Sequence, residues 1–211
     1  MNAIRPLPGD ALIIVDVQND FIPGGALAVP RGDEVIPVIN DAARRFERVI
    51  VTQDWHPAGH FSFASAHPGR NPFEVIPSPH GPQTLWPDHC VQGTRGAALS
   101  DGLEITRARL VIRKGMNPAL DSYSAFFEND RVTPTGLGGA LWELGVRRVF
   151  VTGLATDFCV KFTALDARRL GFEVFVIEDA CRGIDAHGSV EAAWRELAAD
   201  GVARINSSDI A

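Results

Sequence analysis

The chain has 211 residues, of which 45% are hydrophobic, and a formal net charge of −6. This length and composition suit one α/β domain with a sizeable core, so we expect a single domain over residues 1–211. The acidic balance disfavours a nucleic acid or an anionic membrane as partner, no run approaches the roughly 20 apolar residues of a membrane span, and the first apolar run is too short for a signal peptide.

Six apolar runs recur along the chain and predict β-strands. Most are rich in Val and Ile, which favours strands buried on both faces of a sheet. The predicted strands are 11–15, 49–52, 110–112, 148–152, 172–177 and, more weakly, 202–205.

Helical patterns lie between these strands, over 33–46, 137–144, 158–170 and 189–199. Thr135 is a suitable N-cap for the second helix, and Gly145 and Gly171 follow the second and third helices as C-terminal glycines do. Strands that alternate with helices indicate parallel strands joined by crossovers. We therefore predict a three-layer α/β sandwich with a six-stranded, mostly parallel sheet and helices on both faces.

Residues 56–102 break this alternation. The segment is rich in Pro, Gly, His and Ser and has little periodicity. It is too long for an ordinary connection, so we interpret it as a functional excursion from the sheet.

Reactive side chains follow four of the predicted strands. Asp16 follows the first, Asp54 and His56 the second, Lys114 the third, and Cys159 comes after the turn that ends the fourth. Because ligands bind at the carboxyl ends of strands in open α/β sheets, these side chains are expected to converge on one site.

Each of these residues also has a structural interpretation when taken alone. Asp16 can be a turn or capping residue, Lys114 an ion-pair partner, and a free cysteine is most often a small buried hydrophobe. That last interpretation is kept for Cys90 and Cys181. Lys114 is unusual, however, because 18 of the 20 basic residues are Arg.

Together, Asp16, Lys114 and Cys159 predict an activated thiol nucleophile. Asp16 is placed to accept the thiol proton. Cys159 is expected on the first turn of a helix, where the helix N-terminus and Lys114 would lower the pKa of the thiol. The unpaired backbone N–H groups at this helix N-terminus could also hold an oxyanion.

The histidines are concentrated in the excursion, where five of six fall between residues 56 and 89. A carboxylate from Asp54 with the imidazoles of His56, His60 and His89 suits a divalent transition metal. The alternative is a His-rich polar surface loop. His67, His80 and His187 are expected at the surface or behind the site.

Several motifs together resemble the nicotinamidase branch (pyrazinamidase-type) of the isochorismatase-like cysteine hydrolases. The resemblance runs from about residue 11 to residue 183. It rests on the segments VDVQNDF at 15–21, QDWHP at 53–57, WPDHCV at 86–91, KG at 114–115, DSYSAF at 121–126 and GLATDFCV at 153–160.

The resemblance implies a role for each matching position. Asp16, Lys114 and Cys159 match the catalytic triad, and Asp54, His56 and His89 match the metal ligands, with His60 where some members have a further ligand. Residues 154–155 match a cis peptide that aims the Ala155 N–H, with that of Cys159, into the oxyanion hole. The remaining matches line the substrate pocket: Phe21, Trp86 and Tyr123.

The activity implied is hydrolysis of nicotinamide to nicotinate and ammonia, a step of NAD salvage, through a thioester on Cys159. The cofactor expected is one divalent metal ion, Zn²⁺ first, with Fe²⁺ and Mn²⁺ also compatible. Pyrazinamide is a further candidate substrate, and a homo-oligomer is compatible with the sequence. Three cysteines in no regular framework fit a reducing, cytoplasmic location.

Three rival functions remain open from the sequence. A related amidase acting on a carbamoyl or ureido compound would share the triad. A metal-binding or redox module would place Cys159 among the metal ligands. A catalytically silent interaction domain would leave the four reactive strand ends unexplained.

Overall fold

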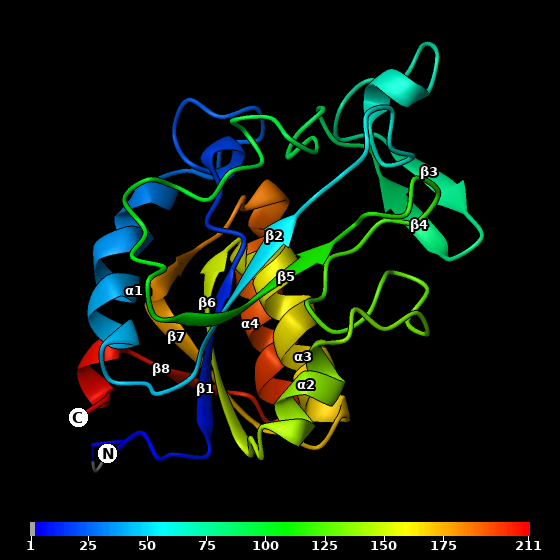
Figure 1. Ribbon diagram of the computed structural model, residues 1–211. Helices are drawn as coiled ribbons and strands as arrows, with labels where there is room; N and C mark the ends of the chain where they lie inside the picture. The colour runs from blue at the N-terminus through cyan, green and yellow to red at the C-terminus, as the bar shows by residue number, and fades with distance from the viewer. Residues whose placement is uncertain (1–2) are drawn as a thin grey trace.

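The computed structural model describes residues 3–211 and has one six-stranded sheet at its centre (Figure 1). The strand order is β5-β2-β1-β6-β7-β8, and every neighbouring pair is parallel. The predicted fold class is therefore confirmed. The strands are β1 (Asp10–Val15), β2 (Val49–Asp54), β5 (Ala108–Lys114), β6 (Arg148–Leu154), β7 (Glu173–Arg182) and β8 (Ala203–Ile205).

The first strand, β1, lies near the centre of this sheet, and the order in which later strands are added reverses on either side of it. It runs outward from β1 to β2 and β5, and then returns to the other side of β1 through β6, β7 and β8. The adjacent strands β1 and β6 thus form a topological switch point, which is where open α/β sheets leave room for a ligand.

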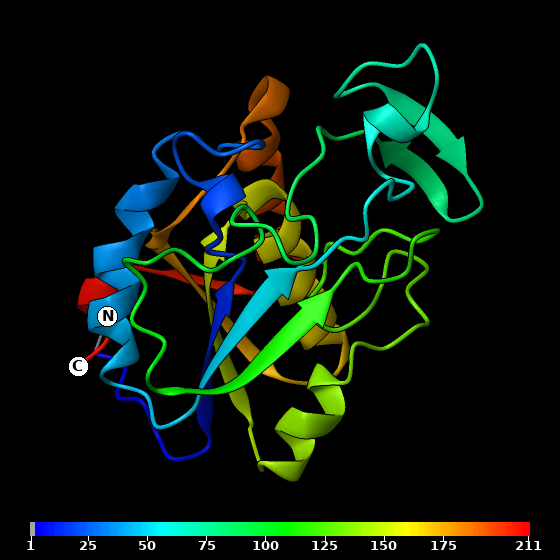
Figure 2. The ribbon, with the colours of Figure 1, turned by 45° about the horizontal axis from the view of Figure 1, so that its top comes forward.

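Four helices cover the two faces unequally, as Figure 2 shows. Helix α1 (Val35–Ala43) lies on one face, where its apolar residues share a buried cluster with Leu12, Ile14 and Val51. Helices α2 (Leu137–Glu143), α3 (Lys161–Arg169) and α4 (Ser189–Ala199) pack on the other face, against a cluster that includes Ile13 and Val151. Alternate residues of each central strand therefore enter opposite cores, as expected for strands buried on both faces.

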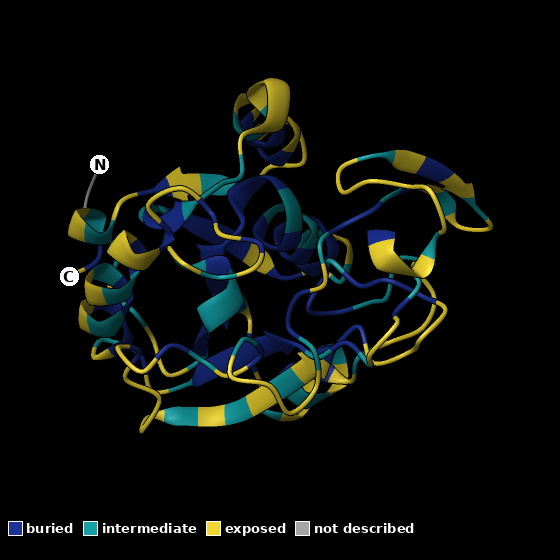
Figure 3. Cartoon of the chain, turned by 90° about the horizontal axis from the view of Figure 1, so that it is seen from above, coloured by how far each residue is buried: buried dark blue, intermediate teal, exposed yellow. Residues whose placement is uncertain are grey.

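The edge strand β5 differs from this central pattern. Its residues alternate between half-buried and exposed until Lys114, and Val111 is 48% exposed. Figure 3 shows this alternation along β5 beside the buried interior strands. Burial on both faces, which was predicted for most of the strands, does not extend to β5, and the short apolar run 110–112 does not reveal that this strand lies at the edge.

The excursion after β2 contains an antiparallel hairpin that the sequence did not predict, formed by β3 (Val75–Ser78) and β4 (Gly81–Thr84). It has a small apolar cluster of its own, formed by Ala64, Ile76 and Leu85. After the hairpin the chain returns to the sheet edge and brings Trp86 and His89 with it. No helix within residues 3–211 is long and apolar enough to cross a membrane.

Candidate active site

Lys114 is the centre of the catalytic cluster at the strand ends. Its ammonium nitrogen Nζ lies 2.9 Å from Asp16 Oδ2 and 3.4 Å from Cys159 Sγ. It also donates to Asp54 Oδ1 and, at 2.9 Å, to the Ser122 carbonyl. The side chain is fully buried. The three residues predicted as a triad are thus in one buried group.

Asp16 follows β1 in an unusual backbone conformation, with φ at 50°. Few residues other than glycine adopt this left-handed region. Its carboxylate accepts a hydrogen bond from the Thr52 hydroxyl at 2.5 Å, and its amide donates to the same hydroxyl at 3.1 Å. Both side chains are inaccessible to solvent.

Cys159 lies in a wide helical turn, Thr156–Val160, rather than in the regular helix predicted from residue 158. In this turn the Val160 amide bonds the Ala155 carbonyl five residues back at 3.1 Å. Helix α3 begins only at Lys161, so the predicted helix start was wrong by three residues. Wide turns of this kind are frequent at functional sites, where they place a side chain that a regular helix would direct elsewhere.

The predicted cis peptide is present between Leu154 and Ala155. Ala155 comes directly before the wide turn and lies at its N-terminus, where backbone amides lack helical acceptors.

Burial changes the expected protonation of the nucleophile. It raises the pKa of the Cys159 thiol well above its usual value, and the lowering effect of Lys114 does not compensate. Lys114 thus lowers the thiol pKa as predicted, but the sequence did not show that Cys159 would be only 6% exposed, and burial outweighs Lys114. Burial therefore disfavours the thiolate, and a base is needed to take the proton of Cys159.

Asp16 is suited to be that base. Burial raises the pKa of its carboxyl, while the Lys114 ammonium acts in the opposite direction. Burial alone would lower the pKa of Lys114, but Asp16 and Asp54 outweigh it and keep the ammonium charged. A carboxylate with a raised pKa accepts a proton more readily than an ordinary one.

Asp54, His56 and His89 form a second buried group beside the first. Asp54 Oδ2 lies 3.7 Å from His56 Nε2 and 3.9 Å from His89 Nε2. Burial would raise the pKa of Asp54, but Lys114 and the two histidines outweigh it and lower it. Burial lowers the pKa of His89 to about 4, whereas Asp54 outweighs burial at His56 and raises its pKa.

These three residues fit a divalent metal ion. The Nδ1 atoms of His56 and His89 face the carbonyls of Gly115 and Pro87, at 2.9 and 2.8 Å, which leaves both Nε2 lone pairs directed toward Asp54. The separations from Asp54 are too long for hydrogen bonds but close to the ~3.4 Å expected between ligands about 2.1 Å from one tetrahedral ion.

His60 is near this group but turned from it. Its ring lies 4.4 Å from that of His56, centroid to centroid. Its Nδ1 lies 2.8 Å from Ser62 Oγ and its Nε2 lies 2.9 Å from the Asn117 carbonyl. Both ring nitrogens of His60 are thus engaged. His60 forms a possible ligand group with His56 and Asp121, and Asp54 belongs to the separate group with His56 and His89.

A small cavity of about 30 Å³ opens between the two groups. Cys159 and Ala155 line it together with Asp54 and His89. The aromatic residues that the resemblance implied line the rest, together with further apolar side chains: Phe21, Trp86, Tyr123, Phe158, Leu27 and Ile184. The ring of Tyr123 is held by a hydrogen bond of 3.2 Å from Trp86 Nε1 to its hydroxyl.

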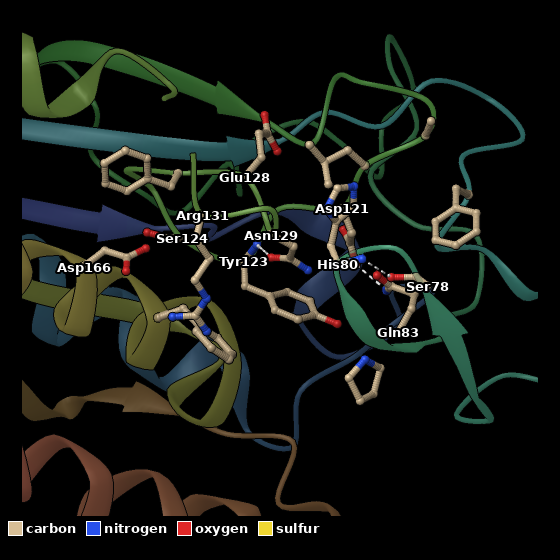
Figure 4. Close-up of a pocket in the computed structure, with 16 residues that line it drawn as sticks. Ser78, His80, Gln83, Asp121, Tyr123, Ser124, Glu128, Asn129, Arg131 and Asp166 are labelled. Atoms are coloured by element: carbon tan, nitrogen blue, oxygen red, sulfur yellow. Dashed lines mark hydrogen bonds between the residues drawn. The ribbon is translucent and has the colours of Figure 1, made fainter. Parts of the chain in front are cut away.

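A larger cavity of about 190 Å³ lies on the other side of Tyr123. Figure 4 shows polar side chains from the hairpin, the segment after β5 and α3 around it. Asp121 and Tyr123 line both cavities, but none of the triad or metal-site residues reaches the larger one. Tyr123 therefore separates a small reactive cavity from a larger polar one.

Three buried residues at the site were missed from the sequence. Thr52 contacts Asp16, as described above. Gln18 accepts from the Asp54 amide and donates to the Asp54 carbonyl, both at 2.8 Å, and so fixes the end of β2. Asp121 accepts from Gln83 at 2.7 Å. Gln18 and Asp121 lie inside matched motifs, so that signal existed, whereas Thr52 looked like an ordinary strand residue.

The isochorismatase domain profile matches residues 10–209. The chain belongs to the isochorismatase family. Among curated relatives in this family, the nicotinamidase of Acinetobacter baylyi is 54% identical over 200 residues, which covers 95% of this chain and 94% of the relative. The nicotinamidase of Escherichia coli is 47% identical over 208 residues, covering 96% and 97%.

Solved structures of the family agree with the fold. A nicotinamidase/pyrazinamidase structure from Acinetobacter baumanii has a TM-score of 0.95 at 55% identity, covering 96% of this chain and 98% of that one. PnC1 from L. infantum in complex with nicotinate has a TM-score of 0.87 at 42% identity, covering 99% and 98%. The pyrazinamidase of Pyrococcus horikoshii in complex with zinc has a TM-score of 0.77 at 38% identity, covering 94% and 99%.

Proposed function

We propose that this chain is a nicotinamidase, a metal-dependent cysteine amidohydrolase that converts nicotinamide to nicotinate and ammonia. The observation that carries the proposal is one small cavity lined by both Cys159 and the metal-site residues Asp54 and His89. A thiol and a metal site that line the same cavity suit a small amide that also carries a ring nitrogen. Relatives named nicotinamidase, at 54% and 47% identity over nearly the whole chain, support it.

The first half of the reaction forms a thioester. Asp16 takes the proton of the Cys159 thiol, and the sulfur attacks the carboxamide carbon. The N–H groups of Ala155 and Cys159 stabilise the oxyanion of the tetrahedral intermediate. Asp16 then gives its proton to the leaving nitrogen, so that the C–N bond breaks and ammonia departs.

The second half releases the acid. A water enters the position that ammonia left, Asp16 takes a proton from it, and the hydroxide attacks the thioester carbon. The C–S bond breaks, the proton on Asp16 returns to the Cys159 sulfur, and the nicotinic acid formed loses its proton to the solvent, where the released ammonia takes it up, to give nicotinate. Lys114 stays charged throughout, because Asp16 and Asp54 hold its proton in place.

Asp54, His56 and His89 are proposed to hold one divalent ion, Zn²⁺ before Fe²⁺ or Mn²⁺. His60 is proposed as a possible further ligand, which would require its ring to rotate away from the Asn117 carbonyl that its Nε2 contacts. When bound, the ion supplies an open coordination position for a ring nitrogen, which orients the carboxamide toward Cys159. The zinc complex of the pyrazinamidase at 38% identity supports this choice of metal.

Phe21, Trp86 and Tyr123 are proposed to sandwich the pyridine ring and to exclude larger amides. The aromatic lining of the cavity favours a flat aromatic ring, so pyrazinamide, which keeps a ring nitrogen, is proposed as a second substrate.

Ammonia release from a panel of amides tests the proposal. The panel holds nicotinamide, pyrazinamide, benzamide and a ureido compound, with metal analysis on the same sample and Cys159→Ala as control. Release from nicotinamide that depends on Cys159 is the expected result. Preference for the ureido compound would instead favour the related carbamoyl or ureido amidohydrolase.

We further propose that residues 1–211 form one domain, although residues 1–2 lie outside the described part. Both large apolar clusters lie against the same sheet, which supports this. A cytoplasmic location is proposed because the three cysteines, Cys90, Cys159 and Cys181, are all buried and unpaired.

A further inference from the structure

Thr52 is a buried polar residue to which the mechanism above assigns no task. It lies on β2, beside β1, and is fully inaccessible to solvent. The parallel register, in which Ile14 pairs with Val51, brings Thr52 level with Val15, the last residue of β1 and the neighbour of Asp16. Within residues 3–211, its hydroxyl forms hydrogen bonds with Asp16 alone, through both the carboxylate and the amide.

The two hydrogen bonds fix the conformation of Asp16. The hydrogen bond from the Asp16 backbone N–H to the Thr52 hydroxyl, at 3.1 Å, holds the backbone of Asp16 in its left-handed conformation, with φ at 50°. That turn is disfavoured for residues with a side chain, so it persists only where the surroundings hold it. The hydroxyl then donates its single proton to Oδ1 at 2.5 Å, which fixes the side chain as well.

The same contacts make the two carboxylate oxygens of Asp16 different. Oδ1 is occupied by the Thr52 hydroxyl. Oδ2 lies 2.9 Å from Lys114 Nζ and, within the described residues, accepts no hydrogen bond of good geometry. The Asp16 carboxylate and Cys159 Sγ lie within 4.8 Å of each other. Oδ2 is thus the oxygen left to take a proton.

We propose that Thr52 is a positioning residue for the general base: its hydroxyl occupies Oδ1 and holds Asp16 so that Oδ2 exchanges the proton with Cys159. This inference rests on the proposed function, in which Asp16 serves Cys159. Thr52 touches neither the substrate nor the sulfur, and its effect passes entirely through Asp16.

The chain offers a matched control on the other side of β1. Thr152 on β6 is equally buried, and its hydroxyl donates to the Ile13 carbonyl at 3.3 Å. Thr52→Val and Thr152→Val each remove one buried hydroxyl beside β1 while keeping the side-chain shape. Only the first removes a contact to the base.

Steady-state kinetics of ammonia release from nicotinamide are measured for both variants at equal metal content. Thr52→Val is expected to lower kcat about 10- to 100-fold with KM changed less than about twofold, because the loss of a hydrogen bond to a charged group acts on the chemical step. Thr52→Ser is expected to keep kcat within about threefold of the wild type. Thr152→Val is expected to leave kcat unchanged while lowering the melting temperature.

Alkylation of Cys159 by iodoacetamide provides a readout that needs no substrate. Thr52→Val is expected to slow alkylation in the wild type and to have no further effect in Asp16→Asn, because both changes act on the same proton transfer. Thr52→Ala, which removes the hydroxyl without adding a methyl group, carries the same expectation if Thr52→Val does not fold.

Two results would overturn the proposal. One is that Thr52→Val slows alkylation of Cys159 equally in the wild type and in Asp16→Asn. The other is a loss of kcat in Thr152→Val as large as in Thr52→Val. The proposed function fails differently, by an absence of ammonia release from nicotinamide in the wild type. The alkylation cycle still tests the coupling of Thr52 to Asp16 in that case.

Discussion

The two halves of the site are built in different ways. Asp16 directly follows β1, Lys114 is the last residue of β5, and Cys159 lies in the turn after β6. They converge because parallel strands end at one edge of the sheet. The metal group takes Asp54 from a strand end and His56 from just beyond it, but His89 comes from the excursion after β2. In the proposed mechanism, the half built at the strand ends, here called the rigid half, carries the bond-making groups, and the partly loop-borne half, here called the selective half, selects the substrate.

This difference teaches where each kind of specificity resides. Residues at strand ends are held by the ladder of backbone hydrogen bonds, so the reactive geometry persists whatever amide enters. Residues on the excursion can differ between relatives without disturbing the sheet. Damage to the first half should therefore remove chemistry for every amide, whereas damage to the second should alter which amides react.

The largest effect is expected from Cys159→Ala. Loss of the attacking atom should lower kcat for nicotinamide and benzamide alike, by roughly 10⁴-fold or more. Parallel assays of the two amides check this. Retention of activity toward either amide would mean that the sulfur is not the nucleophile.

Lys114→Arg tests whether the rigid half needs this side chain or only its charge. The site is closed around one nitrogen that contacts Asp16, Asp54, Cys159 and Ser122, and a planar guanidinium cannot reproduce these directions. A misplacement of about 1 Å predicts a loss of roughly 10²-fold in kcat for every amide. Full activity would show that a generic positive charge is enough.

His89→Ala tests the selective half. Loss of a metal ligand should weaken the orientation of the ring nitrogen, so kcat/KM should fall about 10- to 100-fold for nicotinamide and little for benzamide. The ratio of the two values is the measurement. An equal fall for both amides would contradict the division of the site into two halves.

Tyr123→Phe removes the hydroxyl that accepts a hydrogen bond from Trp86 Nε1 but keeps the ring between the two cavities. Loss of this hydrogen bond, which contributes about 1 kcal/mol net to holding the ring, is expected to raise KM roughly fivefold and to leave kcat unchanged. If kcat falls while KM stays constant, Tyr123 acts on the chemistry and belongs with the rigid half.

The smallest effect concerns Glu128, on the segment after β5. Burial raises the pKa of its carboxyl, and its Oε2 has no hydrogen-bond partner within the described residues. A folded-state pKa above the unfolded value means that ionisation costs stability as the pH rises. Glu128→Gln should therefore raise Tm by about 1–3 °C at pH 8 and by less at pH 5, as thermal unfolding would show. An equal change at both pH values would contradict this.

Much of the fold could be predicted because the strands have clear apolar runs. The interior strands appeared in the sequence as Val- and Ile-rich segments, and their ends located Asp16, Asp54 and Cys159, while the end of the edge strand β5 located Lys114. The hairpin β3–β4 escaped notice because Pro77 and Pro82 interrupt any strand pattern, and its pairing depends on the small cluster beneath it.

The local details of the site depend on tertiary contacts and could not be predicted. The raised pKa of the Cys159 thiol follows from how deeply the surrounding chain covers it. The role of Thr52 depends on the register between β1 and β2, which no local pattern records. The contact between His60 Nε2 and the Asn117 carbonyl likewise joins separate loops.

Rapid quenching of the enzyme during turnover of nicotinamide, followed by peptide mass spectrometry, tests the central claim most directly. The account predicts a transient nicotinoyl group on the peptide that contains Cys159, and none on the same peptide of Cys159→Ala. Full turnover with no adduct at any quench time, together with ammonia release by Cys159→Ala, would contradict it.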